Sequence, residues 1–419
     1  MRPNNLLAIA VFIAAIVNGP AFAQTPSYQD HMTKAGAAFD AEDWTSLNTH
    51  LDDAQAIRPY SLYVWKNRIL ARQLDGRTED ALDLAETIAR RGLSMNLTGH
   101  EALEALTANP VFAPIADKMT ANLAPIGDDG THTLYDDPNL LPEAYAATRR
   151  GAAYIGSVRT GKIIDLSNAS HATGVAMAPG GVFDIELRGK KLWAAVNNQL
   201  AFENAGAEDP FAAIIIYDLK TGEAQQDVRA NAPDALFGDL EVAKDRTAYA
   251  SDSLTPRIFK MAPGGDTLEV FAEDPRFVNL QGIALDQKHK RLFIADYLAG
   301  LFVVELETGA VTAIENTIDA HLGGIDGLYV HRGDLIGVQN GTTPQRIIRI
   351  ALNKDADEAI DLEILAQNLD GWNEPTHGAV IGKQFNYIAT SNWPSYDNDW
   401  NLRDGAEPQP MRIMTVPLD

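Results

Sequence analysis

A pattern of short β-rich segments recurs six times along the larger, C-terminal part of the chain, and it constrains the fold more than any other feature. The second strands of the six copies are predicted at Ala153–Ser157, Leu192–Val196, Ala248–Asp252, Leu292–Asp296, Leu335–Gln339 and Tyr387–Ser391. The third strands are predicted at Lys162–Leu166, Ile214–Tyr217, Arg257–Lys260, Leu301–Val304, Arg346–Arg349 and Arg412–Thr415. The copies are spaced by roughly 40 to 55 residues, which is the length of one four-stranded propeller blade. The sequence therefore predicts an all-β six-bladed β-propeller.

The last copy lacks a segment for its outermost strand, because the chain stops at Asp419 soon after the third strand. A short β-rich segment, Thr131–Tyr135, precedes the first copy and has no place in it. We expect this segment to complete the last blade, so that the two ends of the domain pair and leave no exposed sheet edge.

The part of the chain before the repeats has the apolar spacing of helices from Tyr28 to Leu123. Two helices are predicted within Tyr60–Gly92, joined at Asp75–Arg77, with Thr78 as the capping residue of the second helix. The Gly-Arg-x-Glu-Asp-Ala-Leu turn resembles that of tetratricopeptide repeats, which implies a small all-α TPR-like domain that docks a protein partner. A helical cap on the propeller is the equally weighted alternative.

The N-terminus has the pattern of a secretory signal peptide. Arg2 precedes the apolar run Leu6–Val17, and Ala21–Ala23 offers a small-x-small cleavage site. An uncleaved anchor is the alternative, although the apolar run is short for a membrane span. The predicted organisation is a signal peptide (1–23), a helical domain (24–123) and a propeller (124–419), in a periplasmic or secreted protein with no membrane span in its mature chain.

Composition excludes several functions. The 57 acidic and 34 basic residues give a formal net charge of −23, which argues against a nucleic-acid partner, because phosphate binding requires a clustered basic surface. The chain has no cysteine. This excludes disulfides, thiolate nucleophiles, cysteine-ligated zinc and covalent haem attachment, and no other redox cofactor motif is apparent.

Polar residues stand at the starts of the predicted innermost strands. The six starts are Pro142–Tyr145, Phe183–Ile185, Gly238–Leu240, Leu280–Ile283, Ile325–Leu328 and Glu374–His377. Five contain an acidic residue and the other an amide. Because the innermost strands of all blades line one channel, these oxygen ligands converge and suit Ca²⁺. For any single acid, acceptance of backbone hydrogen bonds is an alternative of about equal weight. Asp252 and Asp296, at the ends of second strands, are interpreted as turn formers.

The segments Leu280–Asp296 and Leu301–Leu306, together with Leu141–Tyr145, make the propeller similar to the SMP-30/gluconolactonase-like family and, more distantly, to the paraoxonase-type lactonases. The resemblance implies a calcium ion in the channel. Glu143 and Asp326 match the acidic ligands of the family. Gly238 and Gln281 replace two ligand asparagines.

The metal ligands implied by the resemblance are therefore Glu143 and Asp326, with Asp239 beside Gly238 and with the amide of Gln281. The general-base histidine of paraoxonase-type lactonases has no clear match. His377 is the one histidine at an inner-strand start, so it and Asp326 are the catalytic candidates.

Two functions remain open on the sequence. The first is a calcium-dependent hydrolase of the lactonase or esterase type, acting on a small molecule in the central channel. The alternative is a non-catalytic propeller that binds a ligand or protein, with the helical domain as a docking module. Trp393, Tyr396 and Trp400, in the longest loop of the last blade, are interpreted either as surface packing or as a gate at the channel mouth.

Overall fold

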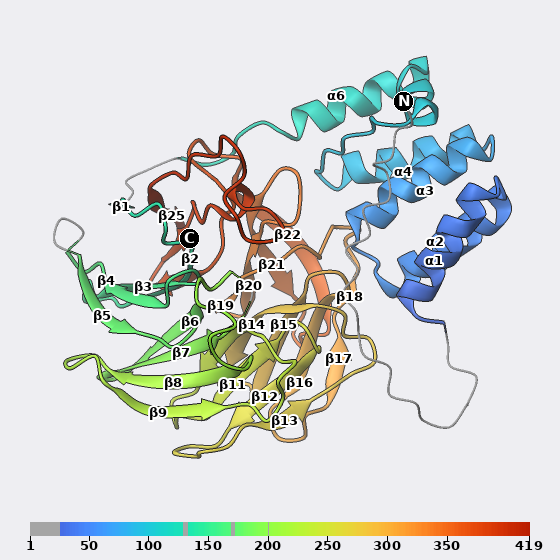
Figure 1. Ribbon diagram of the computed structural model, residues 1–419. Coiled ribbons are helices and arrows are strands. Elements are labelled where there is room, and N and C mark those ends of the chain that lie inside the picture. The colour runs from blue at the N-terminus through green and yellow to red at the C-terminus, as the bar shows by residue number, and fades with distance from the viewer. Residues whose placement is uncertain (1–25, 129–132, 169–171, 200) are drawn as a thin grey trace. The chain divides into compact units, whose positions relative to one another are not determined.

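The computed structural model describes residues 26–128, 133–168, 172–199 and 201–419. The chain divides into two compact units, with the boundary between Asn122 and Leu123. Figure 1 shows helices before this boundary and strands after it. The predicted signal peptide lies outside the described residues. Within the described part of the chain, no helix has the length and apolar character needed to cross a bilayer.

The helical unit contains six α-helices among its described residues. They are α1 (Tyr28–Asp40), α2 (Trp44–Ile57), α3 (Leu62–Leu74), α4 (Thr78–Arg90), α5 (Glu101–Thr107) and α6 (Ala113–Ala121), with a 3₁₀ turn, η1 (Pro110–Phe112), before α6. The predicted helices within Tyr60–Gly92 are thus α3 and α4. Ser27 caps α1 through a reciprocal pair with Asp30, which satisfies backbone N–H groups that a helix start leaves free.

The predicted cap of α4 is wrong. Thr78 is the first helical residue, and Arg77 is the capping residue without a side-chain hydrogen bond to the backbone. The Arg77 guanidinium instead pairs with Asp80, its Nε lying 2.5 Å from Oδ2. Glu79 and Asp80 lie in the first turn of α4, where their negative charges stabilise the positive end of the helix dipole.

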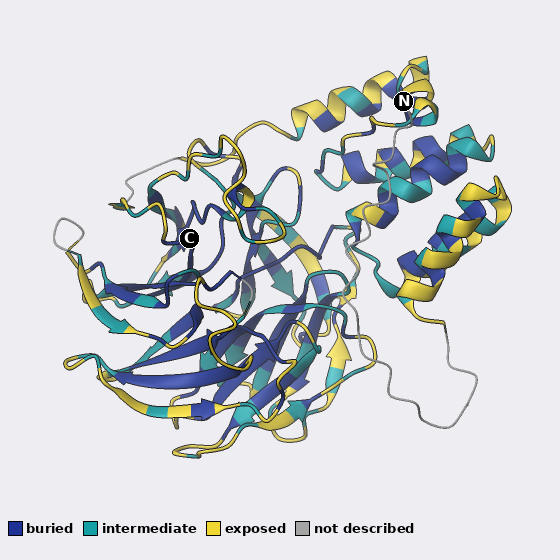
Figure 2. Cartoon of the chain, in the orientation of Figure 1, coloured by how far each residue is buried: buried dark blue, intermediate teal, exposed yellow. Residues whose placement is uncertain are grey.

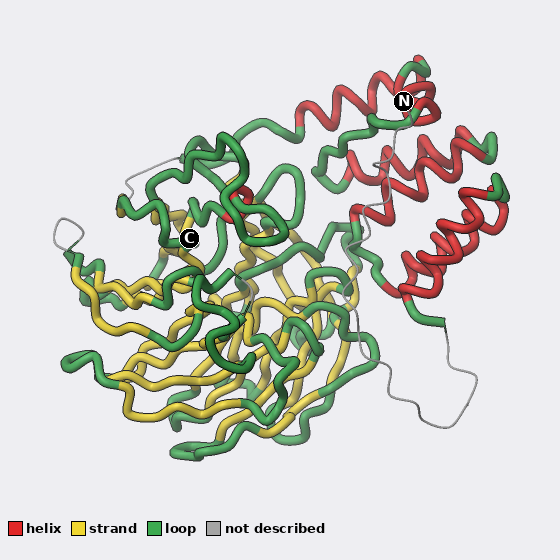
Figure 3. Tube along the Cα trace, in the orientation of Figure 1, coloured by secondary structure: helices red, strands yellow, loops and turns green. Residues whose placement is uncertain are grey.

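The second unit is a six-bladed β-propeller, which confirms the predicted fold class (Figure 3). Blade 1 contains β2 (Pro142–Ala147), β3 (Ala153–Ser157), β4 (Lys162–Asp165) and β5 (Thr173–Met177). Blade 2 contains β6 (Gly181–Arg188), β7 (Lys191–Asn197), β8 (Ala212–Asp218) and β9 (Ala224–Arg229). Blade 3 contains β10 (Phe237–Val242), β11 (Ala248–Asp252), β12 (Arg257–Met261) and β13 (Glu269–Ala272).

Blade 4 contains β14 (Leu280–Asp286), β15 (Arg291–Asp296), β16 (Gly300–Glu305) and β17 (Val311–Ala313). Blade 5 contains β19 (Leu328–His331), β20 (Asp334–Gln339), β21 (Arg346–Leu352) and β22 (Glu358–Gln367), and the short β18 (Glu315–Asn316) runs parallel to β22. Blade 6 contains β23 (Gly378–Ile381), β24 (Gln384–Ile388), β25 (Met411–Pro417) and β1 (Thr133–Tyr135). Every predicted second and third strand overlaps a strand of the structure.

The ring closes by pairing the two ends of the propeller, as predicted. In the last blade β1 lies outside β25 and runs antiparallel to it, with Thr133 opposite Ile413 and Tyr135 opposite Met411. Residues 131 and 132 of the predicted segment lie outside the described residues. The closure gives the last blade a fourth strand and covers the edge of β25.

Small and branched apolar side chains fill the space between neighbouring blades, and Figure 2 shows the central strands almost entirely buried. One contact requires glycine. A Cβ on Gly156 of blade 1 would lie 2.4 Å from Cγ1 of Val182 in blade 2, so a side chain there would force the blades apart. This close packing fixes the innermost strands around the channel.

Candidate functional site

In four blades, the pairing of the innermost strand with its neighbour is irregular next to a polar residue of the channel. The pairing of β2, β6, β10 and β14 with the next strand of each blade shifts near Glu143, Asp184, Asp239 and Gln281. A bulge leaves a residue outside the regular ladder and redirects its side chain. The residues outside the ladder are Glu143 in blade 1, Phe183 in blade 2, directly before Asp184, 238–239 in blade 3 and 281–282 in blade 4.

The first group of channel side chains consists of Glu143, Asp326 and His377, whose potential ligand atoms all lie within 4.8 Å of one another. Trp393 Nε1 donates a hydrogen bond to Glu143 Oε2 at 2.5 Å. Asn340 Nδ2 donates to Asp326 Oδ2 at 2.7 Å. Both carboxylates are therefore held by neutral donors, and both keep an oxygen for which no hydrogen bond is described.

The second group consists of Asp184, Asp239 and His377, again within 4.8 Å of one another. His377 Nδ1 lies 3.2 Å from Asp184 Oδ1. Asp184 Oδ2 accepts the N–H of Leu240 at 3.0 Å, and Asp239 Oδ2 accepts the N–H of Ile283 at 2.7 Å. Backbone groups of blades 3 and 4 therefore fix both carboxyls. His377 belongs to both groups and connects them.

Burial makes the channel acids hard to ionise. It raises the pKa of Asp184 to about 8, and it raises the pKa of Asp239 well above its ordinary value, with the Asp184 charge adding to the effect. The two carboxyls are hydrogen-bonded to each other. Two carboxyls in such contact hold a proton between them, because both cannot be charged at low cost.

The acids of the first group are also shifted. The pKa of Glu143 is raised well above its ordinary value, first by burial and then by Asp326. Burial, with the charge of Asp326, raises the pKa of Glu374 to about 7. Glu374 thus joins Glu143 and Asp326 in a cluster of mutually repelling carboxyls that we call the acidic cluster.

His377 is the basic partner of these acids. Its side chain is almost wholly buried, and burial alone would lower its pKa. The charges of Asp239, Glu143 and Asp326 act in the opposite direction and raise the pKa of His377 above its ordinary value. An imidazole that one carboxyl group orients and others surround is suited to accept and donate a proton.

Two cavities flank these groups. One of about 310 Å³ is lined by Asp184 and Asp239 and, farther along the same strands, by Glu186, Arg188 and Glu241. Another of about 430 Å³ is lined by Tyr297, Asn340 and Glu374 together with the loop 341–345 and Asn368. The second cavity reaches Asp326 through Asn340, and each has room for a small organic molecule.

Three residues with a left-handed backbone lie in or near the acidic cluster in sequence. Leu141, Glu374 and Asn392 have positive φ angles of 40°, 61° and 69°. Leu141 lies two residues before Glu143, and Asn392 directly precedes Trp393, the donor to Glu143. Non-glycine residues in the left-handed region are costly and gather at sites where their side chains or neighbours must be aimed.

The four predicted metal ligands do not lie together in the structure. Glu143 and Asp326 lie together with His377, whereas Asp239 belongs to the group with Asp184. Gln281 Nε2 donates to Asn279 Oδ1 at 3.1 Å, and its Oε1 lies beside Gly238. Asp184 and Glu374 are not among the predicted ligands or catalytic residues, although both are acids at predicted inner-strand starts. Their position at an inner-strand start is the sequence signal that points to them.

Two other sequence interpretations can be followed in the structure. Asp252 Oδ1 accepts backbone N–H groups from Leu236, Leu254 and Thr255, and Asp296 accepts four in the same manner, so both form turns as predicted. Trp393 packs edge-on against Trp400 with ring centroids 5.5 Å apart. The loop thus combines surface packing with a direct contact to Glu143.

The donors of the acidic cluster fit a hard divalent cation. Glu143 and Asp326 offer carboxylate oxygens, the ligands that Ca²⁺ prefers, with potential ligand atoms within 4.8 Å of one another, and Glu374 adds a nearby acidic group. Burial together with the charges of their acidic neighbours raises the pKa of Glu143 and of Glu374, so a cation would relieve the repulsion inside the cluster. The channel therefore holds acidic groups that can bind a metal ion.

Comparisons with known proteins support the fold. No family model matches the chain, and no curated protein sequence matches it. The calcium-binding protein regucalcin from Agrobacterium tumefaciens is similar at 14% identity and a TM-score of 0.50, over 70% of this chain and 97% of that one. The PQQ-bound aldose sugar dehydrogenase from Streptomyces coelicolor has 16% identity, a TM-score of 0.47 and coverage of 70% and 99%. At 14% identity, the likeness to regucalcin shows the fold, a six-bladed propeller, and nothing more.

Proposed function

We propose that the propeller hydrolyses a small lactone or ester in its channel, with His377 as general base and with a divalent cation, Ca²⁺, at the acidic cluster. The proposal rests mainly on the position of His377. Its Nδ1 lies 3.2 Å from Asp184 Oδ1, and its side chain also lies beside Glu143 and Asp326. The proposal agrees with the resemblance to gluconolactonase-like proteins, which by itself is an argument from fold.

His377 takes a proton from the attacking water while Asp184 holds the ring in one orientation. The water oxygen then bonds to the carbonyl carbon, and the bond from that carbon to the ring or ester oxygen breaks. The proton held by His377 passes to the leaving oxygen, which gives a hydroxy acid from a lactone. When bound by Glu143 and Asp326, the cation would supply Lewis-acid polarisation of the carbonyl.

The cavity lined by Tyr297, Asn340 and Glu374 is the proposed substrate pocket. It is the one that contains Glu374 and that reaches Asp326 through the amide of Asn340. Its lining is largely polar, with the Thr342 and Thr343 hydroxyls and the Gln345 amide, which suits an oxygen-rich substrate. A sugar-type lactone fits this description better than a long-chain ester.

The test is hydrolysis of a panel of γ-lactones, δ-lactones and aryl esters by the full chain, in Ca²⁺ and in EDTA. We expect turnover that EDTA removes and Ca²⁺ restores. His377→Gln should lower kcat by about 10²- to 10⁴-fold, the range for loss of a general base. His289→Gln, which changes an exposed turn histidine, is the control. Undiminished turnover in His377→Gln, or no turnover across the whole panel, contradicts the proposal.

The alternative is a binding propeller without catalysis, and one observation favours it. The cavity beside Asp184 and Asp239 also contains Glu186, Arg188 and Glu241, so both charge signs face the same space. Such a lining suits a small zwitterionic or polar ligand. Binding by calorimetry that is lost in Arg188→Gln, with no turnover in any condition, would support this function over hydrolysis.

Export to the periplasm remains part of the proposal, since a weak calcium site can be filled there. Secretion of the full chain with loss of residues 1–23, measured by mass spectrometry of the periplasmic fraction, tests this proposal of export.

The helical unit is proposed to dock a protein partner, in line with its TPR-like turn. The test of docking is the capture of a protein partner by the full chain and the loss of that capture when residues 24–123 are removed.

A further inference from the structure

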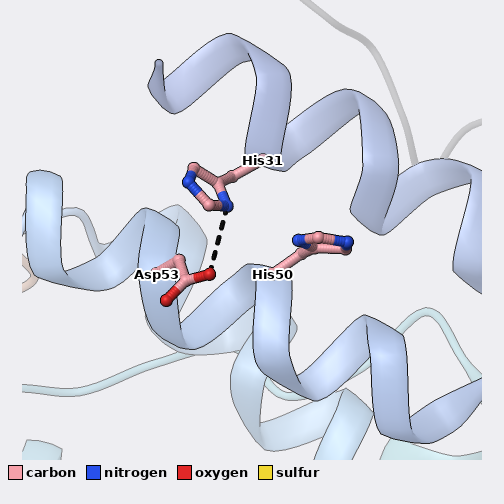
Figure 4. Close-up of side chains that lie close together, drawn as sticks. All are labelled: His31, His50 and Asp53. Carbon is pink, nitrogen blue, oxygen red and sulfur yellow. Dashed lines mark ion pairs between the residues drawn. The ribbon is translucent and has the colours of Figure 1, made fainter. Parts of the chain in front are cut away.

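A second group of metal-capable side chains lies in the helical unit. His31 is on α1, and His50 and Asp53 are on α2, which packs against α1. The potential ligand atoms of the three side chains lie within 4.8 Å of one another. Figure 4 shows both imidazoles and the carboxylate turned toward the same space between the helices.

The buried position of His31 is unusual for a polar residue. It occupies the face of α1 that Ala35 and Ala38 continue into the core. Only 10% of its side chain is exposed. A histidine here displaces an apolar residue from the α1–α2 contact, and its ring nitrogens need partners to offset the loss of water.

Both imidazoles have a buried nitrogen without a hydrogen bond. Among the described residues, neither His31 Nδ1 nor His50 Nδ1 has a hydrogen-bond partner, although His31 Nδ1 forms an ion pair with Asp53 Oδ2 at 3.3 Å. The rings are 5.6 Å apart between centroids. A buried ring nitrogen without a hydrogen bond needs an explanation, and an ion between the two rings satisfies both of them.

The spacing also agrees with metal binding. His50 and Asp53 are three residues apart on α2, so their side chains lie on the same face of that helix. Asp53 Oδ2 lies 3.3 Å from His31 Nδ1. Tetrahedral Zn²⁺ with bonds of about 2.0–2.1 Å needs neighbouring ligand atoms about 3.3–3.4 Å apart.

We propose that His31, His50 and Asp53 form a Zn²⁺ site that clamps α1 to α2. Two imidazoles and one carboxylate are ligands that zinc takes, and three protein ligands leave a fourth position open. The Asp53 side chain is 50% exposed, so water can reach that position. This set contains nitrogen ligands, in contrast to the oxygen ligands of the acidic cluster, and it is separate from the propeller.

The test is a zinc titration of the full chain by calorimetry, followed by the visible spectrum after loading with Co²⁺. We expect His50→Ala and Asp53→Asn each to lower zinc affinity at least about 10-fold, since each removes one ligand. Both residues are less buried than His31, and circular dichroism will show whether their variants keep the helices. Zinc should also raise the thermal midpoint of the wild-type chain and not that of His50→Ala.

The matched control is His289→Asn. His289 Nδ1 lies 2.6 Å from Asp286 Oδ2, so this exposed pair has a histidine and a carboxylate without a second histidine from another element. We expect its zinc binding to equal that of the wild type. Equal affinity in wild type, His50→Ala and Asp53→Asn, or the absence of zinc binding, overturns the proposal and leaves His31 and Asp53 as an ion pair only.

Discussion

His377 Nδ1 lies 3.2 Å from Asp184 Oδ1, although 193 positions separate the two residues in the sequence. His377 directly precedes the innermost strand of blade 6, and Asp184 lies in that of blade 2. The contact crosses the channel and is fixed at its Asp184 end by the backbone N–H of Leu240 in blade 3. Three blades therefore determine the orientation of one imidazole.

Asp184→Asn is expected to lower kcat for lactone or ester hydrolysis by about 10²- to 10⁴-fold, because an amide does not orient His377 as the Asp184 carboxyl does. Asp227→Asn makes the same chemical change at an exposed position on β9 of the same blade and should keep wild-type kcat. Equal losses in both variants would mean that Asp184 acts only through the stability of the blade.

Stability of the calcium-free propeller should fall as pH rises from 5 to 8. Burial raises the pKa of Asp184 to about 8, and burial with the charge of Asp326 raises the pKa of Glu374 to about 7. An unfolded chain loses these protons near pH 4. The folded chain therefore holds more protons between pH 4 and 8, so its stability is fully present below pH 4 and is lost as pH rises through 7 and 8.

Thermal unfolding in EDTA across this pH range measures the effect. Asp184→Asn cannot ionise at this position, so it should show a smaller decrease between pH 5 and 8. A wild-type midpoint that rises over the same interval would contradict the predicted direction.

Asp326→Asn is expected to weaken Ca²⁺ binding by about 100-fold or more, because it removes one charged ligand from the acidic cluster. Asp361→Asn makes the same chemical change at an exposed position on β22 of the same blade. It should leave the affinity unchanged. Calcium titration by calorimetry gives both values, and comparable affinities in the two variants would remove Asp326 from the ligand set.

Replacing Thr133–Tyr135 by Gly-Ser-Gly should lower the thermal midpoint of the propeller by about 5–10 °C, because it removes the strand that closes the ring on β25. The same replacement at Val311–Ala313 removes an outer strand of equal length from blade 4 without opening the ring. We expect a clearly smaller decrease there. Equal decreases would show that β1 contributes no more than an ordinary outer strand.

The sequence by itself determined the repeat and its closure. Alternating β-rich segments and turn residues predict strands through interactions between near neighbours, and the six copies give the number of blades. Asp252 and Asp296 could be interpreted from their place at strand ends, because most of the backbone groups that they bind lie in adjacent turns. The acids of the channel could be listed for the same reason, since each follows from its position in its own blade.

Only the tertiary structure decided which of these acids meet. Asp184 meets His377 because the ladder of β6 shifts directly before Asp184 and because the packing of the blades brings β6 and the start of β23 together, and the second effect is not encoded within one blade. His31 joins His50 and Asp53 only because α1 packs on α2 in one rotation. Local propensity is a property of neighbouring residues, whereas the chemistry of a site depends on distances between segments that meet when the whole chain packs.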